Sequence, residues 1–390
     1  MGFLTKKYQF LLGDITQKGE MVKLLDKCIV RINKSKGYCD YAAKKKFKEQ
    51  YQDIFQNKNT TLKEKFWAQK RGFLSGKIAF YGLTEDNYRD YLAEFDYWKM
   101  YPINGIYSKW IDDKLTTKLI LRPFSEYLPE YYYQVGNDEV LKLMDCPPDY
   151  GQSIEDLVIL LREKRFLAAK LMEGTLGEGF YKLSFDGKKY YKNNQDISEE
   201  DLWKLFDSWK GLKTGGYLVT EYLHTHRELG KIWNETPNKL RIMVIREKNK
   251  PAIIGDAFFS FGTSKTGVID NASAGGVACS VDLQTGELSR PVNLHNQKLV
   301  PSEYHPDTGV RVSGILPYWE LITKTLGEIS EYLPQIRYMG YDIAITDGGF
   351  KIIEINTNQG YTYLQYFCPA FKNPLVADFF TGLLDKQSKH

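Results

Sequence analysis

The chain has 390 residues, of which 43% are hydrophobic and 26% are charged, and its formal net charge is +4. This length predicts two or three packed units, and the composition is typical of a water-soluble globular protein. A charge this small argues against nucleic acid as a partner of the whole chain. No run of 18 apolar residues occurs, so we expect no transmembrane segment.

The cysteines predict a reducing environment. They are few, scattered and free of any CxxC or Cys/His ligand spacing: Cys28, Cys39, Cys146, Cys279 and Cys368. The opening stretch, MGFLTKKYQFLLGD, has too short an apolar run for a signal peptide. We therefore expect a cytoplasmic protein with reduced thiols.

Residues 1–105 predict a helical N-terminal region. Apolar residues recur every three or four positions in MVKLLDKCIVRI (21–32) and DNYRDYLAEFDYWKMY (86–101). Residues 1–120 contain 23 Lys and Arg against 14 Asp and Glu. Either these are solvated helix faces, or the front of the chain prefers an anionic lipid or polymer.

The middle of the chain predicts further helices, followed by a change to short strands. A further helical stretch is expected after residue 110, and DCPPDYGQS (145–153) ends it. The run IEDLVILLREK (154–164) predicts the next helix. From residue 166 onward, short β-like runs alternate with glycine-rich turns.

The rest of the chain predicts mostly strands. Strands are expected in FLAAKL, FYKLSF, KKYYKN, GYLVTEYL, LRIMVIR, PAIIGDAFFSF and GGVACSVDL, and helices in SEEDLWKLFDSWKG, HTHRELGKIW and residues 317–333. The chain is thus of the α+β class, helical in front and largely antiparallel behind.

A hairpin near the C-terminus carries the first chemical signal. In GYDIAITDGGFKIIEINTNQG (340–360), a three-residue loop at 347–349 places Asp342 opposite Glu354, with Asn356 on the same face. Ile343, Ile345, Ile353 and Ile355 then face a core. Opposed carboxylates repel, so either a magnesium ion lies between them or they pair with Lys or Arg.

Two upstream segments suggest a nucleotide site. Lys170 precedes Gly174, Gly177 and Gly179, and a tight turn of backbone N–H groups can cradle phosphate; an ordinary hairpin turn is the alternative. In YLVTEYLHTH (217–226), an apolar strand ends in a polar pair, which suits either a nucleotide base or a plain strand end.

In this order, the segments resemble the ATP-grasp ligases, and more narrowly their sugar-transfer-associated branch. The resemblance covers about residues 105–370, in DDKLTTKLIL (112–121), TPNKLRIMVI (236–245), IDNASAGGVACSVDLQTGEL (269–288), HPDTGVRVSGILPYW (305–319) and the hairpin. It implies an ATP-grasp fold in three parts, with a helical extension at 1–105, a glycine-loop lobe at 106–217 and a metal-binding lobe at 218–390.

The resemblance also implies roles for individual residues. Lys114 and Lys170 match the lysines that contact nucleotide phosphates, beneath a loop of Gly174, Gly177 and Gly179. Glu221 and Leu223 match the hinge near adenine. Asp342, Glu354 and Asn356 match the magnesium ligands, so the implied cofactors are ATP and Mg²⁺.

One position departs from the better-known ligases, such as D-alanine–D-alanine ligase. Those carry an Arg two residues before the metal-binding Asp, where this chain has Gly340. Arg241, Arg311 or Arg337 is left to supply the catalytic charge, with Arg241 and Arg311 as our candidates. Candidate substrate residues, for which loop structure is the alternative, are Asn271, Gly275, Gly276, His305 and Asp307.

The activity implied is an ADP-forming carboxylate–amine ligase acting through an acylphosphate in cell-surface polysaccharide biosynthesis. A kinase that phosphorylates a glycan hydroxyl and a nucleotide-binding scaffold are the alternatives. The expected partners are small-molecule or glycan-linked carboxylate and amine substrates. Homodimer formation and association with membrane-bound glycan assembly enzymes are further hypotheses.

Overall fold

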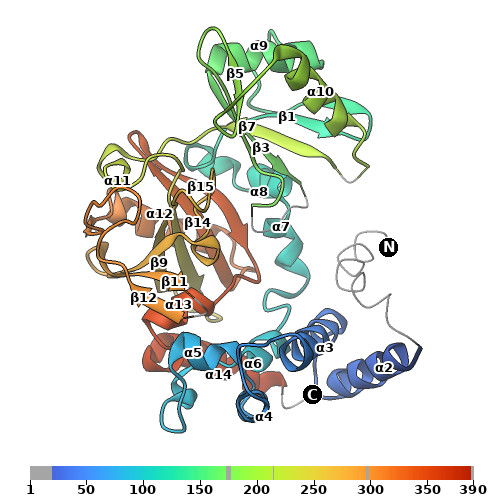
Figure 1. The fold of residues 1–390 in the computed structure, drawn as a ribbon, viewed down its shortest axis with the longest axis vertical. Helices are drawn as coiled ribbons and strands as arrows, with labels where there is room; N and C mark the ends of the chain where they lie inside the picture. The colour runs from blue at the N-terminus through green and yellow to red at the C-terminus, as the bar shows by residue number, and fades with distance from the viewer. Residues whose placement is uncertain (1–19, 173–176, 214, 296–297, 388–390) are drawn as a thin grey trace.

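Two antiparallel sheets and a group of N-terminal helices make up the fold (Figure 1). The computed structural model describes residues 20–172, 177–213, 215–295 and 298–387. The smaller sheet lies in the upper lobe of Figure 1, the larger sheet in the lobe at the left, and the N-terminal helices beneath both. The predicted α+β class is confirmed.

The N-terminal helices agree with the helical periodicity over the described residues. They are α2 (Glu20–Ser35), α3 (Asp40–Phe55), α4 (Leu62–Lys70), α5 (Gly76–Tyr81) and α6 (Glu94–Lys99). Helix α4 begins with a capping box, in which the Thr61 side chain and the Glu64 carboxylate satisfy each other's backbone N–H groups. Short 3-10 helices occur at Tyr88–Asp90, Gly105–Ser108, Arg122–Tyr127, Ala272–Ala274 and Ala370–Lys372.

A pair of short helices connects the N-terminal region to the upper lobe. These are α7 (Lys109–Asp112) and α8 (Lys114–Ile120), and they run up the middle of Figure 1. The prediction of helix as far as residue 145 is wrong, because β1 (Tyr131–Gly136) and β2 (Glu139–Lys142) form a hairpin there. The tyrosines at the start of β1 are strand-favouring residues and lie buried in the lobe.

The smaller sheet has seven strands in the order β2-β1-β7-β3-β4-β5-β6. The remaining strands are β3 (Phe166–Leu171), β4 (Tyr181–Phe185), β5 (Tyr190–Lys192), β6 (Gln195–Ile197) and β7 (Tyr217–Glu221). Helices α9 (Ile154–Lys164) and α10 (Glu199–Lys210) bury their apolar faces against one side of this sheet. Strand β7 thus belongs to this sheet, while the three-part division of the chain stays a prediction.

The larger sheet has eight strands, with the path β12-β11-β10-β9-β8-β14-β15 and β13 paired to β11. Its strands are β8 (Lys239–Ile245), β9 (Ile253–Phe261), β10 (Val277–Val281), β11 (Glu287–His295), β12 (Lys298–Pro301), β13 (Gly314–Ile315), β14 (Tyr338–Thr346) and β15 (Gly349–Asn356). Helix α12 (Trp319–Tyr332) packs on one face. The helix predicted in HTHRELGKIW is reduced to α11 (Arg227–Gly230).

The opposite face of the larger sheet positions the candidate site. It is covered by α13 (Thr362–Phe367), α14 (Pro374–Gln387) and side chains from α2, α3 and α6. On this face the Tyr97 hydroxyl hydrogen-bonds the Tyr338 hydroxyl at 2.9 Å and donates to the Gln359 carbonyl at 2.7 Å. The N-terminal helices therefore share a core with the larger sheet. In the described residues, no helix is both long and apolar enough to cross a membrane.

Candidate active site

Two lysines come from the connector and the smaller sheet. Lys114 is the first residue of α8, whose N-cap is the Asp113 side chain. Its Nζ lies 3.8 Å from Glu354 Oε1 on β15, so α8 and β15 meet at this ion pair. Lys170 stands on β3 opposite Leu218 of β7. Burial, together with the smaller effects of nearby Lys114 and Lys239, lowers the pKa of Lys170 to about 8, although Glu354 and Asp342 oppose the change.

Two more cations lie on β8, facing a carboxylate on β14. Arg241 is directly opposite Asp342, and its Nε and Nη2 bind the two carboxylate oxygens, the second at 3.0 Å. Lys239 Nζ is 3.4 Å from Asp342 Oδ2 and 3.6 Å from Asp270 Oδ1. Burial alone would raise the pKa of Asp342, but Arg241 and Lys239 outweigh it and lower that pKa. Asp342 is therefore ionised at neutral pH.

The hairpin keeps Asp342 opposite Glu354, although by a different route from the one predicted. Thr346 pairs with Gly349, so the turn has two residues instead of three. A bulge between the Asp342 and Ile343 pairs then restores the alignment of the two acids. The prediction that Ile353 faces the core is wrong, because the bulge moves it out and Ile352 is buried instead.

The residues at this place fit a magnesium ion. Directly opposed strand residues lie about 5 Å apart, which lets the Asp342 and Glu354 carboxylates share one hard cation. Asn356 supplies an amide on the same face, and its buried Nδ2 has no hydrogen-bond partner in the described structure. The proposed ligand set of Asp342, Glu354 and Asn356 therefore contains two carboxylates and one amide. No group of three His, Cys, Asp or Glu that could hold a metal occurs among the described residues.

The glycine loop lies against the other lobe. Gly177 and Gly179 have φ of +80° and +66°, the left-handed region that the predicted tight turn needs, while Gly174 lies outside the described residues. A Cβ on Gly177 would come within 3.0 Å of Ile269 Cδ1, next to Asp270. The loop therefore approaches the cluster of charges from the smaller sheet.

In the predicted hinge, which contains Glu221 and Leu223, the Glu221 side chain points away from the side chain of Lys170. Glu221 pairs with Leu167 on β3, and alternation therefore places its side chain on the face opposite that of Lys170. Its carboxylate accepts a hydrogen bond from the Glu130 N–H at 3.2 Å. Leu223 is buried. The predicted contact of Glu221 and Leu223 with adenine stays a prediction.

Arg311 and His305 lie in a surface loop that the structure does not join to the cluster. Arg311 is exposed and pairs with Glu303 at 3.0 Å. The buried His305 ring stacks on Trp233, with ring centroids 5.0 Å apart, and its Nε2 donates to the Gly262 carbonyl at 2.7 Å. These contacts assign His305 to loop structure, and they leave Arg241 as the arginine beside the carboxylates.

Asp307, Asn271 and Gly275 also build loops. Asp307 accepts hydrogen bonds from the Ser264 N–H and hydroxyl. The Asn271 side chain accepts from the N–H of Ser273 and caps the short helix at 272–274. Gly275 ends that helix with φ of +112°. Each residue thus has a complete structural role where it stands.

Two residues of the cluster escaped the sequence analysis. Lys239 is two positions before Arg241 in TPNKLRIMVI, and strand alternation was the available signal that both point to one face. Asp270 precedes the Asn271 turn and accepts a hydrogen bond from the Ser260 hydroxyl at 2.8 Å. Its proximity to Lys239 depends on the pairing of β8 with β9, which no local pattern reveals.

The comparison with protein families is decisive for classification. The family model described as sugar-transfer associated ATP-grasp matches residues 96–368. The chain belongs to this family. The resemblance proposed from the sequence is thereby confirmed, and the helices before residue 96 lie outside the part that the family model matches. No curated protein is significantly similar to the chain.

Solved structures resemble this sugar-transfer associated ATP-grasp protein only distantly. D-alanyl-alanine synthetase A from Vibrio cholerae is 13% identical with a TM-score of 0.40, over 72% of this chain and 66% of that one. N5-carboxyaminoimidazole ribonucleotide synthetase from Thermotoga maritima is 12% identical with a TM-score of 0.34, over 70% and 50%. The D-alanine–D-alanine ligase from Bacillus anthracis complexed with ATP is 11% identical with a TM-score of 0.35, over 72% and 68%. The chain thus spans between half and about two thirds of these proteins.

Gly340 has a steric explanation. A Cβ at this position would lie 2.3 Å from Gln359 Oε1 and 2.6 Å from Gln359 Cβ. The buried Gln359 side chain therefore occupies the space that any side chain at 340 would need. Arg337, the third arginine considered, donates to the Arg246 carbonyl and lies over the Phe379 ring. Of Arg241, Arg311 and Arg337, the structure places Arg241 against Asp342.

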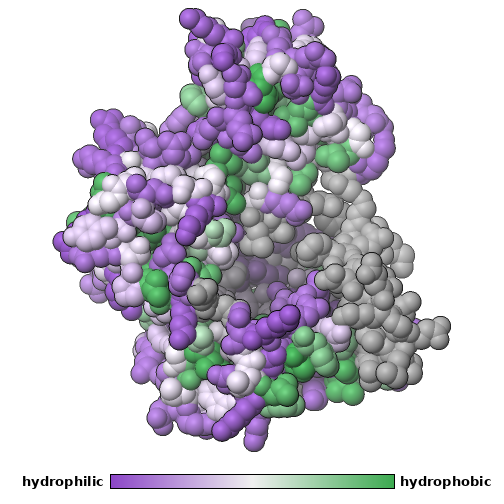
Figure 2. Space-filling model, viewed as in Figure 1, coloured by the Kyte–Doolittle hydropathy of each residue, from purple (hydrophilic) through white to green (hydrophobic). Residues whose placement is uncertain are grey.

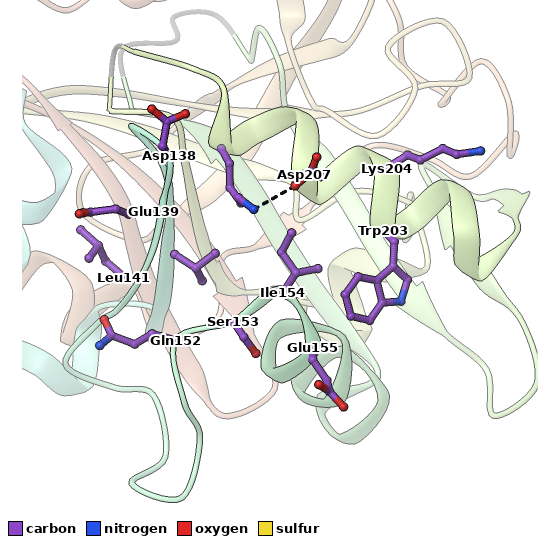
Figure 3. A pocket seen from close by; sticks show the side chains of 12 residues that line it. Asp138, Glu139, Leu141, Gln152, Ser153, Ile154, Glu155, Trp203, Lys204 and Asp207 are labelled. Atoms are coloured by element: carbon purple, nitrogen blue, oxygen red, sulfur yellow. Dashed lines mark ion pairs between the residues drawn. The ribbon is translucent and has the colours of Figure 1, made fainter.

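A separate surface hollow contains none of the predicted site residues. It has a volume of about 880 Å³ and is lined by β2, the start of α9, and α10 (Figure 3). Its charged residues are largely neutralised locally, as Lys210 pairs with Asp207 at 3.0 Å. This hollow and the cluster of charges are therefore separate features of the described structure.

Proposed function

We propose that this protein is an ADP-forming carboxylate–amine ligase that acts in cell-surface polysaccharide biosynthesis. Its substrate would be a sugar acid or an amino acid attached to a glycan or a glycan precursor. The observation that carries the proposal is the meeting of seven charged side chains where the two lobes join: Lys114, Lys170, Lys239, Arg241, Asp270, Asp342 and Glu354. Membership of an ATP-grasp family supports a nucleotide as their ligand.

The lysines, the arginine and the proposed metal ligands each have a proposed role. Lys114 and Lys170 bind phosphate oxygens of ATP from the side of the smaller sheet. Asp342, Glu354 and Asn356 would hold magnesium, which neutralises phosphate charge when bound. Arg241 and Lys239 now neutralise Asp342. In the proposed reaction they would supply positive charge beside the transferring phosphoryl group.

The chemistry requires positioning and charge, and no covalent bond to the protein. A substrate carboxylate oxygen attacks the γ-phosphorus, the bond to the ADP oxygen breaks, and an acylphosphate forms. An amine then attacks the acyl carbon, phosphate leaves, and the amine loses a proton to give the amide. Phosphoryl transfer of this kind is accelerated mainly by oriented cations, which the cluster supplies.

The test is ATP turnover with pools of sugar acids, amino acids and amines, in the presence of hydroxylamine. A trapped hydroxamate is the expected result, because hydroxylamine intercepts an acylphosphate. Glu354→Gln should lower turnover by about 10²-fold or more, since it removes a charge from the proposed metal site. Glu303→Gln makes the same chemical change at an exposed ion pair outside the cluster and should leave turnover intact.

Other outcomes assign other functions. Release of ADP with a stable phosphorylated sugar would identify a kinase. No turnover with any pool, but retained ADP binding, would identify a nucleotide-binding scaffold. The five cysteines are all free thiols, which agrees with action in the cytoplasm, where ATP is available.

A further inference from the structure

The junction of α3 and α4 exposes three large apolar side chains. Phe55 is 68% exposed, Leu62 63% and Phe66 71%. Leu62 and Phe66 are one turn apart on α4 and therefore share a face. Lys65 Nζ, from the same turn, donates to the carbonyls of residues 54 and 57 at 2.9 and 2.6 Å. This contact fixes the start of α4 against the end of α3, so the three side chains lie at one corner of the molecule, which we call the α3–α4 corner.

The corner is rigid, and its apolar side chains are not part of the core. On α4, Lys65 and Ala68 point inward and are buried, whereas Leu62 and Phe66 point outward. Behind the helices, the Asp53 carboxylate accepts from Gln69 at 3.0 Å and from the Ser75 N–H at 3.1 Å. An outward apolar face on a fixed frame marks an interaction surface, because single exposed residues are common but such groups are not.

The charge around this corner is positive. Lys58, Lys63 and Lys70 are exposed, and none of them is in an ion pair within the described part of the chain. The nearest acid on α4 is Glu64, whose carboxylate accepts the Thr61 N–H and hydroxyl at 2.7 Å. Exposed apolar side chains interspersed along the chain with exposed lysines match the chemistry of an anionic bilayer surface.

We propose that the α3–α4 corner is a peripheral docking surface for membranes that contain anionic lipids. The apolar side chains enter the boundary between headgroups and acyl chains, and the lysines contact anionic headgroups. A second copy of this chain fits the corner less well, because a twofold contact would bring the same lysines face to face. Helix α4 lies at the end of the molecule opposite α9 and α10, so docking leaves the upper lobe free (Figure 1).

Figure 2 shows hydrophobic atoms interspersed with hydrophilic ones over the lower, helical end of the molecule. This inference does not depend on the ligase activity, since the corner lies before residue 96, outside the matched family region.

The experiment is co-sedimentation of the full-length chain with vesicles. Pure phosphatidylcholine vesicles are compared with vesicles that contain about 30 mol% phosphatidylglycerol, at low and high salt. We expect binding to the anionic vesicles only, weakened by salt. The combined variant Phe55→Ser, Leu62→Ser, Phe66→Ser should lose at least about ten-fold in partition. The combined variant Lys58→Gln, Lys63→Gln, Lys70→Gln should lose both binding and salt dependence.

Matched controls use equally exposed residues elsewhere. Ile315→Ser removes an apolar side chain that is 66% exposed on the larger sheet, and Lys324→Gln removes an exposed charge on α12; both should bind vesicles as the unaltered chain does. Equal binding to both vesicle types, no binding, or loss in the controls would overturn the proposal. A concentration-dependent dimer abolished by the serine variant would instead identify the corner as a self-association surface. Because the changed residues are exposed, unchanged thermal midpoints verify that the variants fold.

Discussion

Lys170 should take up a proton when a nucleotide binds beside it. In the free protein, burial and the neighbouring cations Lys114 and Lys239 lower its pKa to about 8. A polyphosphate placed against the ammonium group favours the charged form and raises that pKa again. The prediction is therefore tested by adding ADP and measuring how many protons the protein takes up as it binds.

The expected magnitude follows from the free-state pKa. At pH 8 a group with a pKa near 8 is about half protonated, so binding takes up about 0.5 proton; the values are about 0.9 at pH 9 and about 0.1 at pH 7. The pKa of Lys170 is higher when ADP is bound than when the protein is free. ADP therefore binds most tightly below pH 8, where Lys170 already carries its proton. Affinity then falls as pH rises above 8, by up to about ten-fold per unit.

Calorimetric titration with ADP measures this directly. The heat of binding is compared in two buffers with different ionisation enthalpies, at pH 7, 8 and 9, and ADP is used so that turnover does not contribute. Phosphate groups themselves titrate near pH 6 and are ionised at pH 8. The variant Lys170→Arg keeps a cation that stays protonated and should abolish the uptake, whereas Lys114→Arg should retain it.

Two results would refute the reasoning. One is proton uptake at pH 8 that persists unchanged in Lys170→Arg. The other is tight ADP binding by the unaltered chain with no uptake at pH 8 or 9. Failure of ADP to bind at all would instead contradict the proposed nucleotide site.

Three further predictions concern the surroundings of the cluster. Gly340→Ala should lower the free energy of unfolding by about 1–3 kcal/mol in urea titrations, because its Cβ would overlap Gln359; Gly348→Ala, where a Cβ meets open space, is the control, and equal effects would contradict the steric argument. His305→Ala should lower the free energy of unfolding by about 2–3 kcal/mol, because ring stacking and a hydrogen bond are lost, but should leave the ADP affinity measured by calorimetry unchanged. A large drop in ADP affinity would instead indicate that His305 belongs to the site. Arg311→Ala should change ATP turnover less than two-fold, roughly the effect of an exposed surface pair, whereas Arg241→Ala should lower it about 10²-fold or more; an equal loss in the two variants would reverse their assignment.

The hairpin shows how far local patterns extend. Alternation predicted that Asp342, Glu354 and Asn356 share a face, and the structure agrees. The predicted loop length was wrong by one residue, and the bulge compensated for it. Loop length and bulges are set by small energy differences, so a register count from sequence is secure only where a second constraint fixes it.

Long-range pairing decided the rest of the cluster. Nothing in the sequence near Arg241 indicates that Asp342, a hundred residues later, will lie directly opposite it. The same pairing brings Lys239 to Asp342, and the pairing of β8 with β9 brings it to Asp270, so cations of the chain itself lie beside these carboxylates. For His305 the sequence left substrate contact and loop structure both open, and only the tertiary structure showed its ring buried against Trp233.

The sequence by itself determined the α+β class, most of the helices and strands, and the family, because periodicity and short motifs are local properties. It also determined which residue types were available for binding phosphate and magnesium. Only the tertiary structure decided which of them meet, since strand order and lobe contacts join residues far apart in the chain. It decided as well that Gln359 fills the space above Gly340, and that the helices at the front share a core with the sheet that carries Asp342.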